Sequence, residues 1–535
     1  MNVLSGGTFQ NNDPTPTVVG PMGTINIDGG ILNFAGPIIR NGGVFNFNTG
    51  ALRIVDAFTV GTGGLLGMNV TFDSTRQFAT SGTTTIEAFR TLTLNGGGFS
   101  TGTLINNGTL AFNSGRLAIT GASGLNIGTG GLGSIVTLGS GSNLQVTNTA
   151  TVASGASLTL NGGTFSAGTL SNSGTVRVNL GTAAVGAVNN NSGGRVFVGD
   201  TLGASGSWTN AAGATLTLEN NGLVNGLGAL SNSGLVTGTG SIAIPFTNAS
   251  GGEVRGELGK TLTFTGASGS NAGRINLLGG TVQFTQPLTN GATGQINGAG
   301  VIVFPTAPVP SSGSAVAGLN NSGRLNFSGG DTQVYGTVQM LAGSRLIASG
   351  GATATFDDVF RHNGAEVKAS AGSSLVFFGE VRGAGSFTGT GTIYMEGGYS
   401  PGNSPASVAL NTELVLGNAG TLTLELGGLI AGSNYDQLVL GAGGSLALGG
   451  TLLLDLINDF SPVAGDSFQV LDFTLGQLTG GFDEIRLADP LSAGLSFDTT
   501  QLTTTGRIGV VPEPGIAALL LTGGAFLGLR RRNRK

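Results

Sequence analysis

The sequence predicts an all-β protein built as a parallel β-solenoid (β-helix), on three observations. Apolar residues alternate with small polar ones over short stretches, Asn and Gly punctuate these stretches, and the pattern repeats along the chain. Gly makes up 101 of 535 residues, but 39% of the residues are hydrophobic and only 9% are charged, which favours burial over disorder. The glycines follow no strict three-residue period, so a collagen helix is excluded.

The repeats are visible by direct alignment. Residues 92–110 read LTLNGGGFSTGTLINNGTL and residues 158–176 read LTLNGGTFSAGTLSNSGTV, which align without gaps at an offset of 66. A shorter element recurs as LINNG (104–108), LSNSG (170–174 and 230–234) and LNNSG (319–323). Asn248, Asn271 and Asn290 each open a further turn-like stretch, about one solenoid rung apart.

Between these turns, period-two alternation predicts short strands buried on one face, as in residues 158–160, 176–178, 262–264 and 282–284. We expect Asn and Gly at the corners because both tolerate positive φ. A β-sandwich and a propeller also fit short strands, but irregular repeat lengths with constant corner chemistry favour a solenoid. Inward Leu, Val, Ile and Phe would form the core and stacked Asn a ladder. About 20 residues per rung would give a rod of about 90 Å that needs caps.

The chain divides into three predicted parts: a solenoid over residues 1–382, a C-terminal module over 383–510 and a tail over 511–535. A Pro/Gly/Ser-rich break, SPGNSP at 400–405, precedes longer apolar strands such as TLTLEL (421–426) and TLLLDL (451–456). With YDQLVL (435–440) and the run from Gly449 to Phe473, this cluster resembles the C-terminal passenger modules of autotransporter-like and PEP-CTERM surface proteins. The resemblance implies a β-rich cap and no activity.

The tail joins Pro512-Glu513-Pro514 to an apolar run, residues 515–529, and a basic cluster. This order resembles the PEP-CTERM sorting signal of Gram-negative, biofilm-forming bacteria, in which an exosortase-type membrane enzyme recognises Pro-Glu-Pro. The resemblance implies that these three residues are the recognition element and that the run enters the membrane transiently as a short helix. The membrane stop signal would be Arg530, Arg531, Arg532, Arg534 and Lys535.

A permanent tail anchor is the alternative interpretation of the apolar run. Its fifteen residues would span roughly 22 Å as a helix, whereas a bilayer core is about 30 Å thick. Gly515, Gly523, Gly524 and Gly528 also weaken a helix there. Both features favour processing over lasting residence.

Composition and charge exclude several other classes. The absence of Cys removes disulfides, thiolate catalysis and Cys-based metal sites. The basic residues outside the terminal cluster are not gathered as a nucleic-acid surface requires, so we expect no nucleic-acid partner. An exported precursor begins with a leader, but Met1 to Phe9 already read like repeat sequence. We therefore expect a truncated start; a cytoplasmic protein with an accidental tail match is the alternative.

No residue cluster predicts an active site, and we expect no enzyme, cofactor or metal. His362 is the single histidine, and with Asp357 and Asp358 it would supply too few ligands for a metal. We expect a polar loop beside Phe356, Val359 and Phe360. Further charged residues are scattered as on a solvated face: Asp331, Glu366, Glu380, Arg345, Arg361 and Lys368. The C-terminal aspartates are expected in turns rather than on calcium: Asp436, Asp455, Asp459, Asp466 and Asp483.

The sequence thus predicts an exported structural or adhesive protein of the cell surface or extracellular matrix. An exosortase-type enzyme is the expected partner, with transient membrane contact through residues 515–529 and exopolysaccharide as a further candidate. Trp208 is the single Trp and there are four Tyr, so few aromatic platforms for glycans are expected. Two alternatives remain: a carbohydrate-active enzyme on a β-helix, and an unprocessed, tail-anchored envelope protein.

Overall fold

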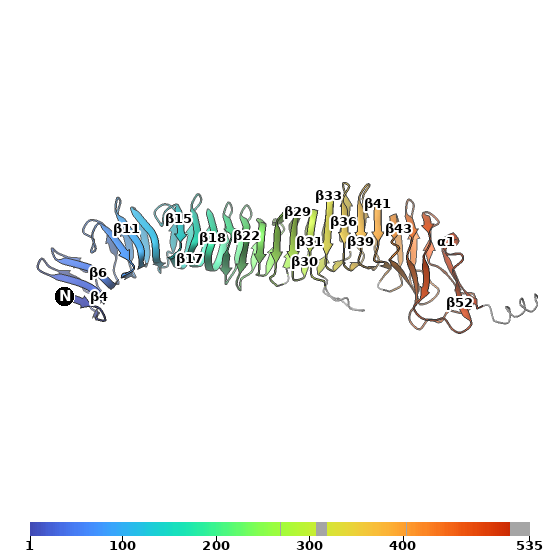
Figure 1. Ribbon diagram of the computed structural model, residues 1–535, viewed down its shortest axis with the longest axis horizontal. Helices are drawn as coiled ribbons and strands as arrows, with labels where there is room; N and C mark the ends of the chain where they lie inside the picture. Colours follow the sequence, from blue (N-terminus) through green and yellow to red (C-terminus); the bar gives the residue numbers. More distant parts are fainter. Residues whose placement is uncertain (268, 307–317, 403, 514–535) are drawn as a thin grey trace, which may run out of the picture. The chain divides into compact units, whose positions relative to one another are not determined.

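The computed structural model describes residues 1–267, 269–306, 318–402 and 404–513. The chain forms two compact units, the first comprising residues 1–276 and 280–286 and the second residues 277–279 and 287–535. Each unit is a stack of parallel strands (Figure 1), so the predicted all-β parallel β-solenoid is confirmed. In the described residues, no helix is long and apolar enough to cross a membrane. The predicted membrane helix, 515–529, lies outside them.

The strands before the division near residue 277 have the following bounds: β1 (Asn2–Leu4), β2 (Thr8–Asn11), β3 (Thr17–Val19), β4 (Thr24–Phe34), β5 (Ile38–Arg40), β6 (Val44–Ile54), β7 (Phe58–Val60), β8 (Asn69–Asp73), β9 (Arg76–Thr80), β10 (Thr83–Ile86), β11 (Thr91–Thr101), β12 (Thr103–Asn106), β13 (Thr109–Ile119) and β14 (Leu125–Ile127). They continue with β15 (Ile135–Gly139), β16 (Ser142–Val152), β17 (Ser157–Asn172), β18 (Thr175–Asn190), β19 (Arg195–Val198), β20 (Thr201–Ala204), β21 (Trp208–Asn210), β22 (Thr215–Asn225), β23 (Leu230–Asn232), β24 (Leu235–Ile242), β25 (Phe246–Asn248), β26 (Glu253–Glu257), β27 (Thr261–Phe264) and β28 (Gly269–Asn271).

From the division onward the elements are β29 (Arg274–Phe284), β30 (Leu288–Asn290), β31 (Gln295–Val303), β32 (Leu319–Asn321), β33 (Arg324–Tyr335), β34 (Val338–Met340), β35 (Arg345–Ser349), β36 (Thr353–Phe356), β37 (Phe360–His362), β38 (Glu366–Ala369), β39 (Ser374–Phe377), β40 (Val381–Arg382) and β41 (Ser386–Met395). The last are β42 (Tyr399–Ser400), β43 (Ser407–Leu416), β44 (Thr421–Leu426), β45 (Gln437–Leu440), β46 (Ser445–Leu448), β47 (Thr451–Leu456), β48 (Ser467–Gln469), β49 (Leu471–Asp472), β50 (Gln477–Gly480), β51 (Glu484–Leu487), β52 (Leu495–Asp498), α1 (Leu502–Thr505) and β53 (Arg507–Pro512).

The rungs stack in register because apolar residues point inward at every second position. In the first unit Leu158 pairs with Val176, Val176 with Val196 and Val196 with Leu216, at offsets of 18, 20 and 20 residues. All four side chains are fully buried. The predicted rung of about 20 residues and the inward apolar core are therefore confirmed.

The corners differ from the prediction in one respect. Gly does supply positive φ at many turns, for example Gly155 and Gly193. The repeated asparagines do not: Asn172 is the last residue of β17, lies outside the positive-φ positions and has a fully buried side chain. Its role rests on its side-chain amide, which has hydrogen-bond donors and an acceptor that an apolar residue lacks.

Two corners of the first unit are longer than the other corners that follow a three-residue strand. Residues 61–68, between β7 and β8, begin GTGGL, and residues 128–134, between β14 and β15, begin GTGGL as well. The ordinary corner between β21 and β22 holds only residues 211–214. At each long corner the strand that follows pairs with a strand of the next rung, β8 with β11 and β15 with β17. Within residues 1–267, all described, neither pairs with the first half of the preceding long strand.

In the second unit, parallel pairing crosses residue 383, where the sequence predicts a module boundary: β38 and β39 both pair with β41. It continues through β43 and β46 to β50. The last sheet is different, since β48 and β52 pair antiparallel with β53. A separate C-terminal module stays a prediction.

Candidate functional site: a buried polar column

A column of buried asparagines runs through the first unit along one corner. Each is the last residue of its strand and at most 1% exposed. From Asn172 to Asn248, each side-chain Nδ2 donates to the Oδ1 of the asparagine in the next rung, at 2.7–2.8 Å. The members in order are Asn172, Asn190, Asn210, Asn232, Asn248 and Asn271. The predicted Asn ladder is therefore confirmed.

A further hydrogen bond from Nδ2 reaches the strand that follows the corner of the next rung. Asn210 donates to the Leu235 carbonyl at 3.1 Å, and Asn232 to that of Glu253 at 3.2 Å. In the other direction, Asn232 Oδ1 accepts from the Gly234 backbone N–H at 3.2 Å. The buried amides thus replace the hydration that they lose, which is the condition for burying polar groups without a large penalty.

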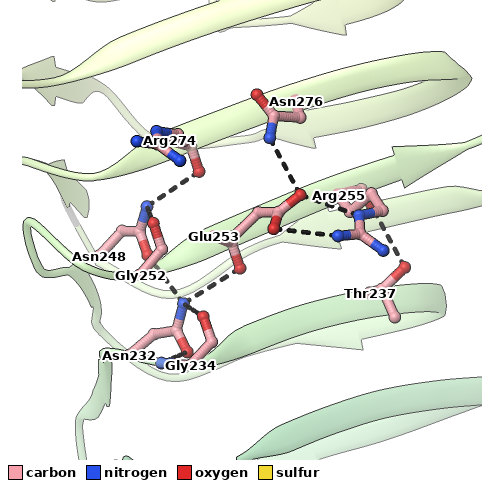
Figure 2. A network of polar contacts seen from close by, with 9 residues as sticks. All are labelled: Asn232, Gly234, Thr237, Asn248, Gly252, Glu253, Arg255, Arg274 and Asn276. Atoms are coloured by element: carbon pink, nitrogen blue, oxygen red, sulfur yellow. Dashed lines mark hydrogen bonds and ion pairs between the residues drawn. The ribbon is translucent and has the colours of Figure 1, made fainter. Parts of the chain in front are cut away.

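A half-buried polar network adjoins the column at Glu253 (Figure 2). The Glu253 carbonyl accepts from Asn232, while its carboxylate accepts from Arg255 at 2.8 and 3.0 Å and from Asn276 Nδ2 at 2.9 Å. The hydrogen bonds from Arg255 are the main reason why the pKa of Glu253 lies below its ordinary value. Thr237 donates its hydroxyl to the Arg255 carbonyl at 3.2 Å. These contacts join three successive rungs on the surface.

In the second unit the column changes composition. Asn290 donates to Asn321 at 2.6 Å, but Asn321 then meets the sulfur of Met340 at 3.3 Å, a weak acceptor. Met340 pairs with His362 in the next rung. The single histidine therefore occupies the column position rather than the expected polar loop. It is the last residue of β37 and fully buried, because period-two alternation from Phe360 turns it inward.

His362 reproduces only half of the asparagine contacts. Its Nε2 donates to the Ala365 carbonyl at 2.8 Å, and Nδ1 is buried without a partner among the described atoms. The ring packs edge-on against Phe387, and a Cβ at Gly385 would lie 2.3 Å from Nε2, so only Gly leaves room for the imidazole. Burial lowers the pKa of His362 to about 4, so the ring is neutral at pH 7.

Charged residues considered as candidates in the sequence are placed as follows. Asp358 accepts from the Gly336 N–H at 2.8 Å, and burial raises the pKa of Asp357 above its ordinary value. Glu366 pairs with Arg345 at 3.0 Å, and Glu380 with Arg382 at 2.7 Å. Across the described ranges, no group of three or more His, Asp and Glu side chains could hold a metal ion.

Asp436 is a buried carboxylate that joins two backbone segments, a role that the alternation of apolar and polar residues did not predict. Its two carboxylate oxygens accept from the backbone N–H groups of Ala406 at 2.7 Å and Glu425 at 2.8 Å, and burial raises its pKa to about 7. Two other C-terminal aspartates do hold turns. Asp466 accepts from the Val463 N–H, and Asp483 from the Gly450 N–H.

Only part of the predicted recognition element is described. Pro512 ends β53 and pairs with Leu495, and the Glu513 N–H donates to the Gly494 carbonyl at 2.8 Å. Both side chains are exposed. Pro514, the apolar run and the basic cluster lie outside the described residues.

Comparison with known proteins adds little to this picture. No protein-family model matches the chain, and no curated protein matches it. One similar solved structure is the crystal structure of a TibC-catalyzed hyper-glycosylated TibA fragment, residues 55–350. It is 13% identical, covers 82% of this chain and 100% of that chain, and has a TM-score of 0.18. At that score the likeness carries no argument about function, which must come from the residues themselves.

Proposed function

We propose that this protein is a structural, adhesive component of the cell surface or extracellular matrix. It is exported and sorted through its C-terminal PEP-CTERM-type signal. The observation that carries the proposal is the buried amide column. Its polar groups are satisfied by one another and by backbone, so they hold rungs together and present nothing to a substrate.

The surface supports the same role. Charged side chains engage one another, across neighbouring strands for Arg345 and Glu366 and within β26 for Arg255 and Glu253. The single Trp, Trp208, is fully buried and offers no stacking platform for a glycan. Adhesion would therefore use flat, polar, Thr- and Asn-bearing strands, with exopolysaccharide as the candidate partner.

Sorting is the second part of the proposal. Pro512, Glu513 and Pro514 would be recognised by an exosortase-type enzyme while residues 515–529 sit transiently in the membrane and the basic cluster stays cytoplasmic. The exposed side chains of Pro512 and Glu513 support access to this sequence.

The deciding experiment replaces both prolines, Pro512→Ala with Pro514→Ala, and fractionates cells and medium. The substituted protein should stay with the cells and keep its C-terminal peptides, which mass spectrometry should not find in the mature wild-type protein. The same mature form in the same place for both proteins would refute the sorting assignment. Release of reducing ends from polysaccharides by the purified chain would refute the non-enzymatic role.

A further inference from the structure

The first unit contains a place where two facing strand edges lack a partner strand. The second half of β6 pairs with β9, from Gly50 with Arg76 to Ile54 with Thr80. The first half of β6, residues 44–48, pairs with β4 on one side only, and β8 pairs with β11 on one side only. In residues 1–267, which the structure describes without a gap, no pairing joins β6 to β8. The longer corner at residues 61–68 accounts for this opening.

Alternate residues on each edge point their backbone groups into the opening. Val44 donates its N–H to the Gly23 carbonyl on the β4 side, so alternation turns the backbone groups of Phe45 and Phe47 the other way. On the opposite edge, the Thr71 carbonyl accepts from Arg76 Nη1 at 2.9 Å, which shows that Thr71 faces the opening. Unpaired N–H and C=O rows of this kind are templates for another strand.

The space between the edges is a cavity of about 200 Å³. The accessible atoms that line it are almost all polar, and the Phe47 and Phe72 rings, whose centroids lie 6.3 Å apart, are buried. Arg76 lines it and hydrogen-bonds to a carbonyl on each edge, Asn48 through Nε and Thr71 through Nη1, both at 2.9 Å. The guanidinium thus already supplies donors in the place where the N–H groups of an inserted strand would lie.

We propose that this opening, the β6/β8 slot, binds an extended peptide strand of another protein by β-augmentation on both edges. The occupant is recognised through its extended backbone, whose N–H and C=O groups meet those of the two edges. Its backbone would pair with five residues on each edge, the length of β8. A second folded copy is a poorer source, because each strand in the described residues already belongs to a sheet.

The test uses the full chain and a labelled, acetylated peptide reading TLTLNGG, the sequence of residues 91–97. The start of this segment already pairs with the other edge of β8. The peptide should bind saturably, and a version N-methylated at alternate residues should bind at least tenfold more weakly, since it lacks half of the donors. On peptide binding, amide exchange in residues 44–48 and 69–73 should slow at least tenfold.

Two variants locate the site. Thr71→Pro removes an N–H that faces the slot while leaving the β8–β11 hydrogen bonds, so it should weaken binding at least tenfold. Thr71→Val keeps that N–H and should bind like wild type. If Thr71→Pro fails to fold, judged by circular dichroism, the N-methylated peptide decides the question on wild-type protein.

Three results would overturn the proposal: equal binding of the N-methylated peptide, unchanged exchange in both segments, or slot protection that grows with protein concentration without peptide. The last would assign the slot to a second copy. None of these results bears on sorting, so the proposed function is tested separately.

Discussion

The buried polar column is uniform in the first unit and mixed in the second. From Asn172 to Asn271 each asparagine is joined to the next by a hydrogen bond from Nδ2 to Oδ1. After Asn321 the second unit places Met340 and His362 at the corresponding positions, and the series of hydrogen bonds between side-chain amides ends. The difference teaches that the position tolerates apolar or aromatic residues, but a buried polar atom then loses its partner. Satisfied networks stabilise, and partly satisfied ones are sensitive to change.

The largest effect is expected from breaking the uniform column at its centre. Asn210→Ala removes hydrogen bonds to Asn190, Asn232 and the Leu235 carbonyl, so each of these buried groups loses one partner. We expect a loss of about 4 kcal/mol in the free energy of unfolding. Urea denaturation followed by Trp fluorescence measures it, since Trp208 is the single Trp and lies on the same strand.

The matched control is Asn189→Ala, on the exposed side of β18 next to Asn190. It should change stability by less than about 0.5 kcal/mol. Equal effects of the two substitutions would show that the column contributes nothing beyond ordinary surface polarity.

The mixed column should respond to acid. The pKa of His362 is lowered to about 4 in the folded chain, while an unfolded histidine titrates near 6.5, so the unfolded state binds more protons between these values. Stability from His362 is therefore complete above pH 6.5, falls as the pH drops toward 4 and is constant below it. The loss is about 3 kcal/mol.

Two measurements check this. Because the chain holds one histidine, its imidazole proton resonances can be followed by NMR without overlap, and they should titrate near pH 4. His362→Asn should abolish its share of the acid sensitivity. Titration near pH 6.5 in the folded protein would contradict the buried placement.

A smaller effect is expected two rungs further along. The Tyr399 hydroxyl is buried and donates to the Gly383 carbonyl at 3.1 Å. Tyr399→Phe should therefore cost about 1 kcal/mol. Tyr335→Phe is the control, because that hydroxyl bonds to Gln333 at an exposed site, and thermal unfolding of both should separate them.

The half-buried network beside the uniform column should matter least. Glu253→Gln weakens the contacts to Arg255 and Asn276 at partly exposed positions, for an expected loss of about 0.5 kcal/mol that shrinks with added salt. A loss as large as that of Asn210→Ala would show that the column and the network act as one unit.

Much of the fold was predictable because alternation and turn residues report local geometry. The stretches at residues 158–160 and 176–178 are strands with inward apolar residues, and the Asn ladder follows from the repeated short element. Positive φ, the expected reason for Asn at the corners, holds at Asn220 and Asn221 but not at the column asparagines, since backbone and side-chain roles of Asn look alike in a sequence. The burial of His362 in the column was not predicted, because it depends on the register with Met340 and register is not visible in the sequence of one rung.

The β6/β8 slot was not predictable either. Residues 69–73 alternate in the same way as a strand paired on both sides, and only the pairing reveals the free edge. The tail prediction rests on residues that lie mostly outside the described ranges and stays a prediction.

The long GTGGL corner has a consequence for how such a chain grows. The offset of 66 residues between the two aligned repeats carries β11 to β17 through β13 and β16, which is three rungs. The two GTGGL corners, at residues 61 and 128, are separated by nearly the same distance. Since each rung contacts only its neighbours, a tandem duplication of this length lengthens the gene product by whole turns. Each such copy would carry its own strand edge that lacks a partner strand.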